Sequence, residues 1–271
     1  MCRHLAYLGP PATLRSVVIE PPHGLYKQAW APRFQRYGTV NADGFGVGWY
    51  SPVDPDPARY RRTIPIWGDE SFADVARVTR AVAMLAAVRC ATPGTDLGPA
   101  PIAPFTSGRW LFSHNGVIDG WPGSAAGLAA TLPADLLLGL EARVDSALLW
   151  ALVQHRLRLG LAAPDALSDT VATLDAAGLT GRFNLLLTDG RLIAATAAGD
   201  TLYYRRGGQQ AGVIVASEPG DDEPGWTEVP GNSVVTAAPQ QVTVTELDRS
   251  TTQRHEATEN PKIIDGRIPT R

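Results

Sequence analysis

The sequence predicts an α+β fold in which two β-sheets are stacked between layers of helix. Strand patterns occupy the first part of the chain, amphipathic helices fill the middle, and strand patterns return from residue 182 onward. Such separate runs of strands and helices are typical of α+β proteins. Since no repeat or linker interrupts the pattern, we expect a single domain over residues 1–271, with a polar tail from about residue 249.

The composition is that of a globular protein with a nearly balanced charge. Of the 271 residues, 44% are hydrophobic, and the formal net charge is −3. No basic run predicts a nucleic-acid or anionic-membrane partner. The longest apolar stretches fall well short of the ~18 residues that a membrane helix needs, and no secretory leader is recognisable. Two cysteines without metal-ligand spacing predict a cytoplasmic protein with no disulfide framework and no metal site. No organic cofactor is expected either.

In the first half, alternation and helical spacing define the elements. Phe45, Val47 and Trp49 alternate with glycines, which predicts a strand that another backbone or a ligand approaches closely. Acidic residues followed by apolar residues at helical spacing predict a helix over residues 69–84. Residues 9–42 predict mostly loop. The other predicted strands are residues 6–8, with Cys2 at the exposed end, a buried strand ending near Val88, and residues 110–116, which stop in a polar turn.

The second half begins with helices and ends with strands. Leucines on one face predict a helix over residues 145–159, and a second helix is expected over 164–177. Asp189-Gly190 predicts a two-residue hairpin turn. The strands expected here are residues 183–188, 192–196, 201–205, 212–216, 233–236 and 242–247.

Cys2 is the first residue with catalytic potential. Because residue 2 is small, we expect the initiator methionine to be removed, which leaves a cysteine with a free α-amine. The unperturbed pKa is about 8 for that amine and about 8.5 for the thiol. An N-terminal amine can act as general base for its own side-chain nucleophile, so no histidine base is required. Alternatively, Met-Cys is a start without catalytic meaning.

Three further positions have both a chemical and a structural interpretation. Asn115 and Gly116 offer two N–H donors for an oxyanion, although Asn-Gly is also a common turn pair. Arg89 ends an apolar strand, where it would hold a substrate carboxylate or form a structural ion pair. Asp145 begins a helix, where it would hold an ammonium group or cap the helix.

The histidines and the second cysteine fit structural roles better. His4 and His114 lack a third orienting group at a recognisable spacing, so a Cys-His dyad is not favoured. By strand alternation, Cys90 should face away from Arg89 as a small core residue.

Taken in order, these features resemble the glutaminase domain of class II glutamine amidotransferases, which are N-terminal-nucleophile hydrolases. The resemblance implies a four-layer αββα sandwich. It also implies that Cys2 is the nucleophile and that Asn115 and Gly116 form the oxyanion hole. The motifs that carry it are Cys2, Asp43-Gly44-Phe45-Gly46, Arg89-Cys90-Ala91-Thr92, Ser113-His114-Asn115-Gly116 and Asp145.

The same resemblance assigns the substrate's amino-acid head. Arg89, helped by Thr92, would bind the α-carboxylate of a γ-glutamyl group, and Asp145 would bind its α-ammonium. His114 is counted with these substrate-binding residues. Pro93 departs from the pattern, because many amidotransferases carry a histidine there, so the carboxylate pocket is expected to differ in detail.

Three longer segments resemble one stand-alone subgroup, the ergothioneine-pathway hydrolases that remove glutamate from γ-glutamyl-hercynylcysteine sulfoxide. These segments are residues 1–9, 41–50 and 216–226. The expected partner is therefore a small γ-glutamyl molecule, and the oligomeric state stays open. The alternatives are a glutaminase that supplies ammonia to a partner synthase and a non-catalytic γ-glutamyl-binding protein. The leaving-group side is expected from residues 20–40, with Tyr26, Trp30 and Tyr37.

Overall fold

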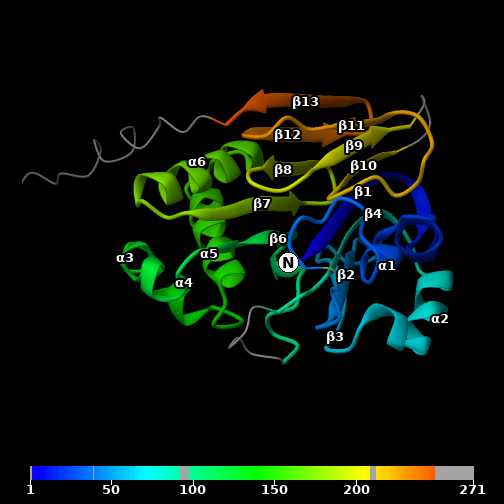
Figure 1. The fold of residues 1–271 in the computed structure, drawn as a ribbon, viewed down its shortest axis with the longest axis horizontal. Helices are drawn as coiled ribbons and strands as arrows, with labels where there is room; N and C mark the ends of the chain where they lie inside the picture. The colour runs from blue at the N-terminus through cyan, green and yellow to red at the C-terminus, as the bar shows by residue number, and fades with distance from the viewer. Residues whose placement is uncertain (1, 39, 92–97, 208–211, 248–271) are drawn as a thin grey trace, which may run out of the picture.

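The computed structural model describes residues 2–38, 40–91, 98–207 and 212–247. Within these ranges the chain forms two antiparallel sheets that lie face to face, with helices on both outer sides (Figure 1). The predicted α+β sandwich with layers in the order αββα is therefore confirmed. Thr92 and the predicted polar tail lie outside the described residues.

The first sheet, as far as the described residues show it, has seven strands with β1 at its centre. In spatial order they are β11 (Trp226–Glu228), β9 (Tyr203–Arg206), β10 (Val213–Ala216), β1 (Arg3–Thr13), β4 (Arg80–Val88), β2 (Phe45–Trp49) and β3 (Ala58–Arg62). Its outer face is covered by the π-helix η1 (Arg15–Ile19), α1 (Leu25–Gln28) and α2 (Glu70–Val78), with the 3-10 turn η2 (Ile66–Gly68) nearby.

The second sheet has six strands in the described part of the chain. Their order is β13 (Gln241–Glu246), β12 (Ser233–Ala238), β8 (Ile193–Ala197), β7 (Gly181–Thr188), β6 (Trp110–Ile118) and β5 (Phe105–Ser107). Helices α5 (Asp145–Arg158) and α6 (Ala163–Ala176) pack on its outer face. Shorter elements on that side are η3 (Gly123–Ala125), α3 (Ala126–Ala129) and α4 (Ala134–Leu138).

Three apolar clusters hold the layers together. The cluster beneath α5 and α6 is built from large side chains such as Phe112 and Trp150, whose rings stack with centroids 5.1 Å apart. The cluster between the sheets contains mainly alanine, valine and leucine, including Ala6, Ala83 and Ala195. Small side chains let the two sheets approach closely. That close approach brings the start of β1 next to β6.

Strand β1 is paired along both edges, which fixes the position of Cys2. Arg3 lies opposite Val88 of β4, and Leu5 lies opposite Ala216 of β10. Extending the β4 register by one residue brings Cys2 opposite Arg89. The strand also runs to Thr13, with an irregular register around its two prolines. Residues 9–13, expected to be loop, are therefore strand, because pairing with β4 continues past the irregularity.

The helix predicted over residues 69–84 is wrong in its second half. Helix α2 ends at Val78, Thr79 is extended, and residues 80–88 form β4. Val78 and Val82, predicted on the apolar helix face, have exposed fractions of 64% and 45%. The β-branched and small residues of this stretch pair with β1, and that pairing prevails over local helical spacing.

Helices η1 and α1 lie within residues 9–42, which were expected to be mostly loop, and their residues Val17, Val18 and Leu25 pack in the outer apolar cluster. Most other predicted elements lie close to where they were expected. The Asp189-Gly190 hairpin is confirmed, but its loop spans four residues because Thr188 pairs with Ile193. Strands β3, β5 and β11 were not expected from the sequence. Two of them have only three residues, too short for alternation to be recognised. No helix among the described residues is long and apolar enough to cross a bilayer.

Candidate active site

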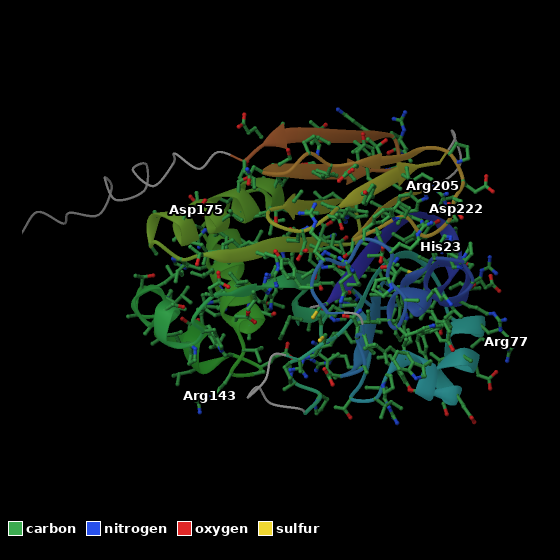
Figure 2. All side chains as sticks on the ribbon, viewed as in Figure 1. His23, Arg77, Arg143, Asp175, Arg205 and Asp222 are labelled. Atoms are coloured by element: carbon green, nitrogen blue, oxygen red, sulfur yellow. The ribbon has the colours of Figure 1, made fainter. Side chains whose placement is uncertain are left out.

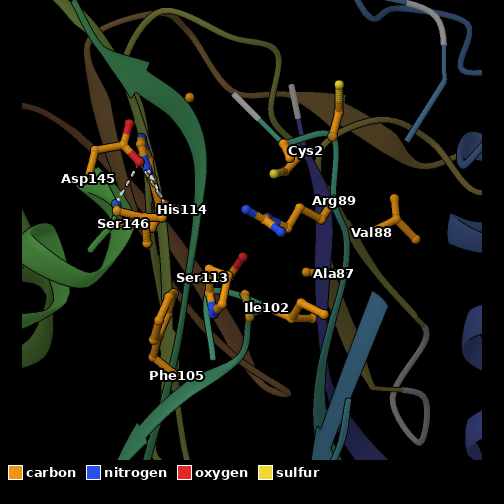
Figure 3. Close-up of a pocket in the computed structure, with 16 residues that line it drawn as sticks. Cys2, Ala87, Val88, Arg89, Ile102, Phe105, Ser113, His114, Asp145 and Ser146 are labelled. Carbon is orange, nitrogen blue, oxygen red and sulfur yellow. Dashed lines mark hydrogen bonds between the residues drawn. The ribbon is translucent and has the colours of Figure 1, made fainter. Parts of the chain in front are cut away.

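Five of the predicted site residues line one cavity at the start of β1 (Figure 3). They are Cys2, Arg89, His114, Gly116 and Asp145. The cavity is narrow, with a volume of about 40 Å³. In Figure 3 the Arg89 side chain extends from one wall toward His114, Ser146 and Asp145 on the other. The structure thus brings together residues from four separate parts of the sequence.

The Arg89 backbone is held by the turn that precedes β2. Its N–H donates to the Gly44 carbonyl at 2.8 Å, and its carbonyl accepts from the Asp43 N–H at 2.9 Å. The Asp43 carboxylate also accepts from the Ala91 N–H at 2.7 Å. The Asp43-Gly44 turn therefore does more than lead into a strand, because it fixes the chain on both sides of Arg89. Arg89 as a whole residue is only 7% exposed.

The Cys2 side chain is half-buried, and its surroundings favour the thiol over the thiolate. Burial raises the pKa of the Cys2 thiol, while a hydrogen bond from the Cys90 N–H and the positive charge of Arg89 partly offset that rise. A buried thiol needs a base to become a nucleophile. The histidines do not supply one, because burial lowers the pKa of His4 to about 3 and, as described below, both ring nitrogens of His114 have protein partners.

The expectation for Cys90 is wrong. Cys90 is half-buried and lines the same cavity as Cys2. The prediction extended strand alternation one residue past Arg89, but β4 ends at Val88, so the alternation no longer applies there. Both cysteines are free thiols.

Asn115 and Gly116 lie inside β6, not in a turn at its end. Asn115 pairs with Asn184 and Gly116 with Phe183, and the strand continues to Ile118. A Cβ at Gly116 would lie 1.8 Å from the Arg182 carbonyl oxygen, so only glycine fits this position. The local turn preference of Asn-Gly is thus overridden by pairing with β7.

The Asn115 side chain is on the face of β6 that meets β1. His4 Nδ1 and Ser113 Oγ, 3.1 Å apart, connect the two strands. Because side chains alternate along a strand, Cys2 shares a face with His4, and Asn115 shares a face with Ser113. Both amide atoms of Asn115 are buried and make no hydrogen bond with a described residue. Asn115 does not itself line the cavity beside Gly116.

Asp145 and His114 form a hydrogen-bonded wall. The Asp145 carboxylate accepts from the backbone N–H of Ile118 at 3.0 Å and of Ser146 at 2.7 Å. His114 Nε2 donates to the Arg182 carbonyl at 2.9 Å, and Nδ1 lies 3.0 Å from the Ser146 hydroxyl oxygen, which also contacts Asp145 Oδ1 at 3.4 Å. Both His114 nitrogens therefore have protein partners. Ser146 was not predicted, although its place beside Asp145 in the first helical turn could have indicated it.

Thr92, predicted to help Arg89, lies outside the described residues. Among the described residues, no group of three or more His, Cys, Asp or Glu side chains suits a metal ion.

A sandwich of this layering, with a cysteine at the start of its central strand, defines a fold of the class II glutamine amidotransferase type. A solved class-II glutamine aminotransferase domain protein from Silicibacter pomeroyi has this fold. It superposes with a TM-score of 0.66 at 22% identity, covering 91% of this chain and 100% of that one. At this identity the likeness concerns the fold alone.

Sequence comparison identifies the family. The γ-glutamyl-hercynylcysteine sulfoxide hydrolase of Mycobacterium tuberculosis is 42% identical over 251 residues, which is 92% of this chain and 98% of that protein. The hydrolase of the same name from Mycolicibacterium smegmatis is 42% identical over 247 residues, covering 91% and 100%. No protein-family model matches the chain. The chain belongs to the γ-glutamyl-hercynylcysteine sulfoxide hydrolase family, whose members are amide hydrolases.

Proposed function

We propose that this protein hydrolyses the γ-glutamyl amide bond of γ-glutamyl-hercynylcysteine sulfoxide and releases glutamate, as part of ergothioneine biosynthesis. The observation that carries the proposal is the single cavity in which Cys2, Arg89 and Asp145 meet. A thiol, a cation and an anion in that arrangement suit an acyl group with a zwitterionic amino-acid head. The printed names of the two mycobacterial relatives support this substrate.

In the proposed mechanism, the backbone amine of Cys2 is the general base after removal of Met1. It takes the thiol proton as the sulfur attacks the γ-carbonyl carbon, and it then delivers that proton to the departing nitrogen. The C–N bond breaks and a γ-glutamyl thioester forms. Water then attacks the carbonyl carbon of the thioester, and the C–S bond breaks. Glutamate is released, and the Cys2 thiol is regenerated. The raised pKa of the buried Cys2 thiol makes such a base necessary.

The oxyanion of each tetrahedral intermediate is assigned to Asn115 and Gly116. The Asn115 amide N–H groups have no described hydrogen-bond partner, so they can donate to a developing charge without first breaking a bond. Preorganised donors of this kind are effective because no reorganisation is needed during the reaction.

We assign the head group to Arg89 and Asp145, with Thr92 as a helper of Arg89. The helix N-cap is Val144, so Asp145 does not cap α5. Asp145 Oδ1 accepts from the Ser146 N–H and hydroxyl, whereas Oδ2 accepts from the Ile118 N–H and can accept a second donor such as an ammonium group. The hydrogen bonds of His114 favour a positioning role, because they orient Ser146 beside Asp145. No metal or organic cofactor enters this scheme. We also propose that the enzyme acts in the cytosol as one domain, since a thiol nucleophile beside a second thiol needs a reducing compartment.

The decisive experiment measures glutamate released from γ-glutamyl-hercynylcysteine sulfoxide and, in parallel, from glutamine. The protein is first checked by mass spectrometry for removal of Met1. A much higher kcat/KM for the sulfoxide supports the proposal. Preference for glutamine would instead indicate an ammonia-supplying glutaminase. Binding without release from either compound would indicate a γ-glutamyl-binding protein.

A further inference from the structure

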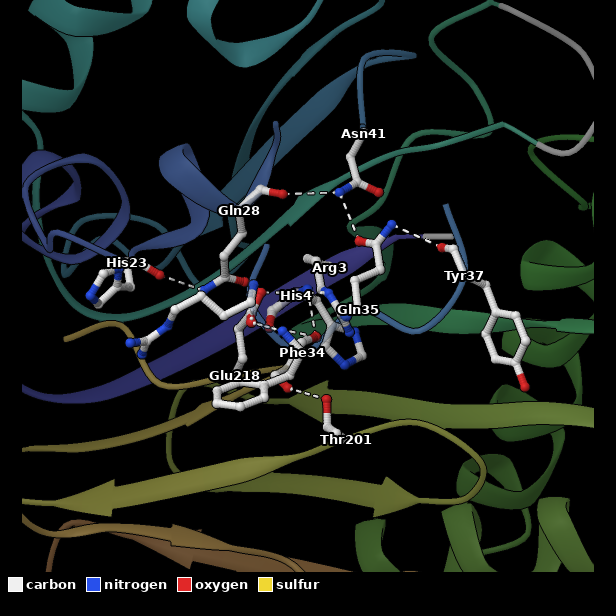
Figure 4. A network of polar contacts seen from close by, with 12 residues as sticks. Arg3, His4, His23, Gln28, Phe34, Gln35, Tyr37, Asn41, Thr201 and Glu218 are labelled. Atoms are coloured by element: carbon white, nitrogen blue, oxygen red, sulfur yellow. Dashed lines mark hydrogen bonds and ion pairs between the residues drawn. The ribbon is translucent and has the colours of Figure 1, made fainter. Parts of the chain in front are cut away.

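Glu218, in the Ala-Ser-Glu-Pro segment at residues 216–219, occupies a buried position beside the nucleophile strand. Its carboxylate is 1% exposed, and its Oε1 lies 3.8 Å from Nε of Arg3, the residue after Cys2. Its other oxygen accepts from the backbone N–H groups of Arg33 at 2.8 Å and Phe34 at 2.7 Å. Figure 4 shows Glu218 close to both Arg3 and Phe34. One side chain therefore connects β1 with the segment formed by residues 33–38.

The neighbouring Ser217 strengthens this connection. Its hydroxyl accepts from the His4 N–H at 3.0 Å, and its own N–H donates to the His4 carbonyl at 2.9 Å. A buried ion pair adds little net stability, because desolvation offsets much of its Coulomb attraction. The Arg3–Glu218 pair is therefore better explained by the two chain segments that it holds together than by a gain in stability.

The far end of the 33–38 segment lies near the predicted oxyanion donors. The Tyr37 ring centroid is 4.4 Å from Cζ of Arg182. The carbonyl of the same Arg182 accepts from His114 and is the group that excludes a side chain at Gly116. Tyr37 thus contacts the side chain of the residue whose backbone carbonyl borders Gly116. The segment extends from the nucleophile strand to the oxyanion side of the site.

The segment presents aromatic side chains to solvent. Phe34 is 41% exposed and Tyr37 is 54% exposed. Tyr26 and Trp30, expected to share this role, pack edge-on against each other at 5.1 Å and belong to the outer apolar layer. Exposed aromatic rings held by a buried carboxylate are suited to contact a ligand.

Positive charge accompanies these rings. Arg182 lies against Tyr37 and forms an ion pair with Asp200 at 3.2 Å. Arg36 is exposed on the same segment. Two guanidinium groups beside two rings suit an amine leaving group that carries a planar or apolar body and a carboxylate. Ammonia, the leaving group of glutamine, would use none of these contacts.

We propose that the 33–38 segment forms the leaving-group side of the site, with Phe34 and Tyr37 as its contact surface, and that Glu218 is the positioning residue that fixes it. This inference rests on the proposed function, because it concerns the amine released in that reaction. It also gives the Ala-Ser-Glu-Pro segment a physical role.

The test compares Glu218→Gln and Tyr37→Ala with the wild-type protein. We expect KM for γ-glutamyl-hercynylcysteine sulfoxide to rise about tenfold in each variant, the size of one lost aromatic contact. The inhibition constant of L-glutamate, which fills only the head-group side, should stay within about threefold. A merely structural role would move both constants together.

Asp169→Asn is the matched control for Glu218→Gln. Asp169 is also the carboxylate partner of a buried arginine, Arg156, but this ion pair joins α6 to α5. In this variant, KM for the sulfoxide substrate and the inhibition constant of L-glutamate should both stay at their wild-type values. If Glu218→Gln does not fold, Tyr37→Ala still tests the inference, because Tyr37 is exposed and its replacement should not prevent folding.

An unchanged KM in both variants, or an equal rise in the glutamate constant, would overturn the inference. If the wild-type protein releases no glutamate from the sulfoxide, the proposed function itself has failed. The two failures are therefore distinguishable.

Discussion

The two faces of β1 differ in the kind of polar group that they bury. On the face toward β6, Cys2 lines a cavity and the Asn115 amide has no described partner. On the opposite face, Arg3 is paired with Glu218, whose second oxygen accepts two backbone N–H groups. The face toward β6 thus buries neutral polar groups. The opposite face buries an ion pair, in which the Arg3 guanidinium nitrogens and Glu218 Oε1 make no hydrogen bond with a described residue.

At the periphery, polar side chains form exposed pairs, such as His23 with Asp222 at 2.9 Å. Figure 2 shows His23, Arg205 and Asp222 on one side of the molecule. Exposed pairs of this kind contribute little to stability. We expect substitutions of Cys2 and Asn115 to change mainly activity, and substitutions of His4 and of the outer helix layer to change mainly stability.

Replacing Cys2 with alanine should have the largest effect. We expect kcat for glutamate release to fall by at least about 10³-fold, because no other described thiol or base takes over the attack. Substrate binding, measured by calorimetry, should be largely retained. Cys90→Ser, which alters the second thiol of the same cavity, should retain activity within about threefold. Loss of activity in Cys90→Ser alone would contradict the assignment of Cys2 as the nucleophile.

Asn115→Ala should separate activity from stability. We expect kcat to fall about 10²–10³-fold, the usual result of removing one oxyanion donor. The melting temperature should not fall in parallel, because the amide has no described hydrogen bond to lose. Kinetics and thermal denaturation of the same preparation provide the measurement. A large drop in melting temperature with normal kcat would assign Asn115 a structural role.

His4 should make the stability depend on pH. Its folded-state pKa is about 3, lowered chiefly by burial, while an unfolded histidine titrates near its model value of 6.5. Below about pH 6.5 the unfolded chain therefore gains a proton that the folded chain does not accept. The unfolding free energy should fall by about 1.4 kcal/mol per pH unit, or about 2 kcal/mol at pH 5 relative to pH 7.

Urea denaturation of wild type and His4→Gln at pH 7 and pH 5 tests this dependence. Glutamine can still hydrogen-bond to Ser113 but does not titrate. The wild-type loss between the two pH values should exceed the His4→Gln loss by most of the expected difference. Identical losses would mean that His4 is not the titrating group.

Asp69→Ala should have the smallest effect, on stability alone. Asp69 caps α2 by accepting from the Phe72 N–H at 3.2 Å, and it also accepts from the Tyr60 hydroxyl at 2.9 Å. Loss of the cap should cost about 1 kcal/mol, with kcat unchanged. Asp69→Asn, which keeps a capping oxygen, should recover most of the loss. A change in kcat would show that the outer helix layer is coupled to the site.

Local patterns predicted the elements whose residues interact mainly with near neighbours. The leucine face of α5 and the glycine alternation of β2 are of this kind, and both lie where expected. The second half of the predicted 69–84 helix failed because β4 pairs with a strand about 70 residues earlier, which local spacing cannot reveal. The Asn115-Gly116 turn failed for the same reason, since pairing with β7 decides its conformation.

The candidate site was predictable where residue chemistry is unusual. A cysteine at position 2 and an arginine at the end of an apolar strand stand out in the sequence, and both line the cavity. Cys90, Ser146 and Glu218 were not identified, because their importance comes from residues that the fold brings near them. Glu218 meets Arg33 across 185 sequence positions, and no local motif contains such a contact.

The double pairing of β1 has a consequence for how the protein matures on the ribosome. The strand is synthesised first, yet His4 receives its partner Ser217 only 213 residues later. Until β10 emerges, β4 is the sole neighbour with which β1 can pair in its own sheet. The surroundings of Cys2 are therefore complete only after residue 217 has been synthesised.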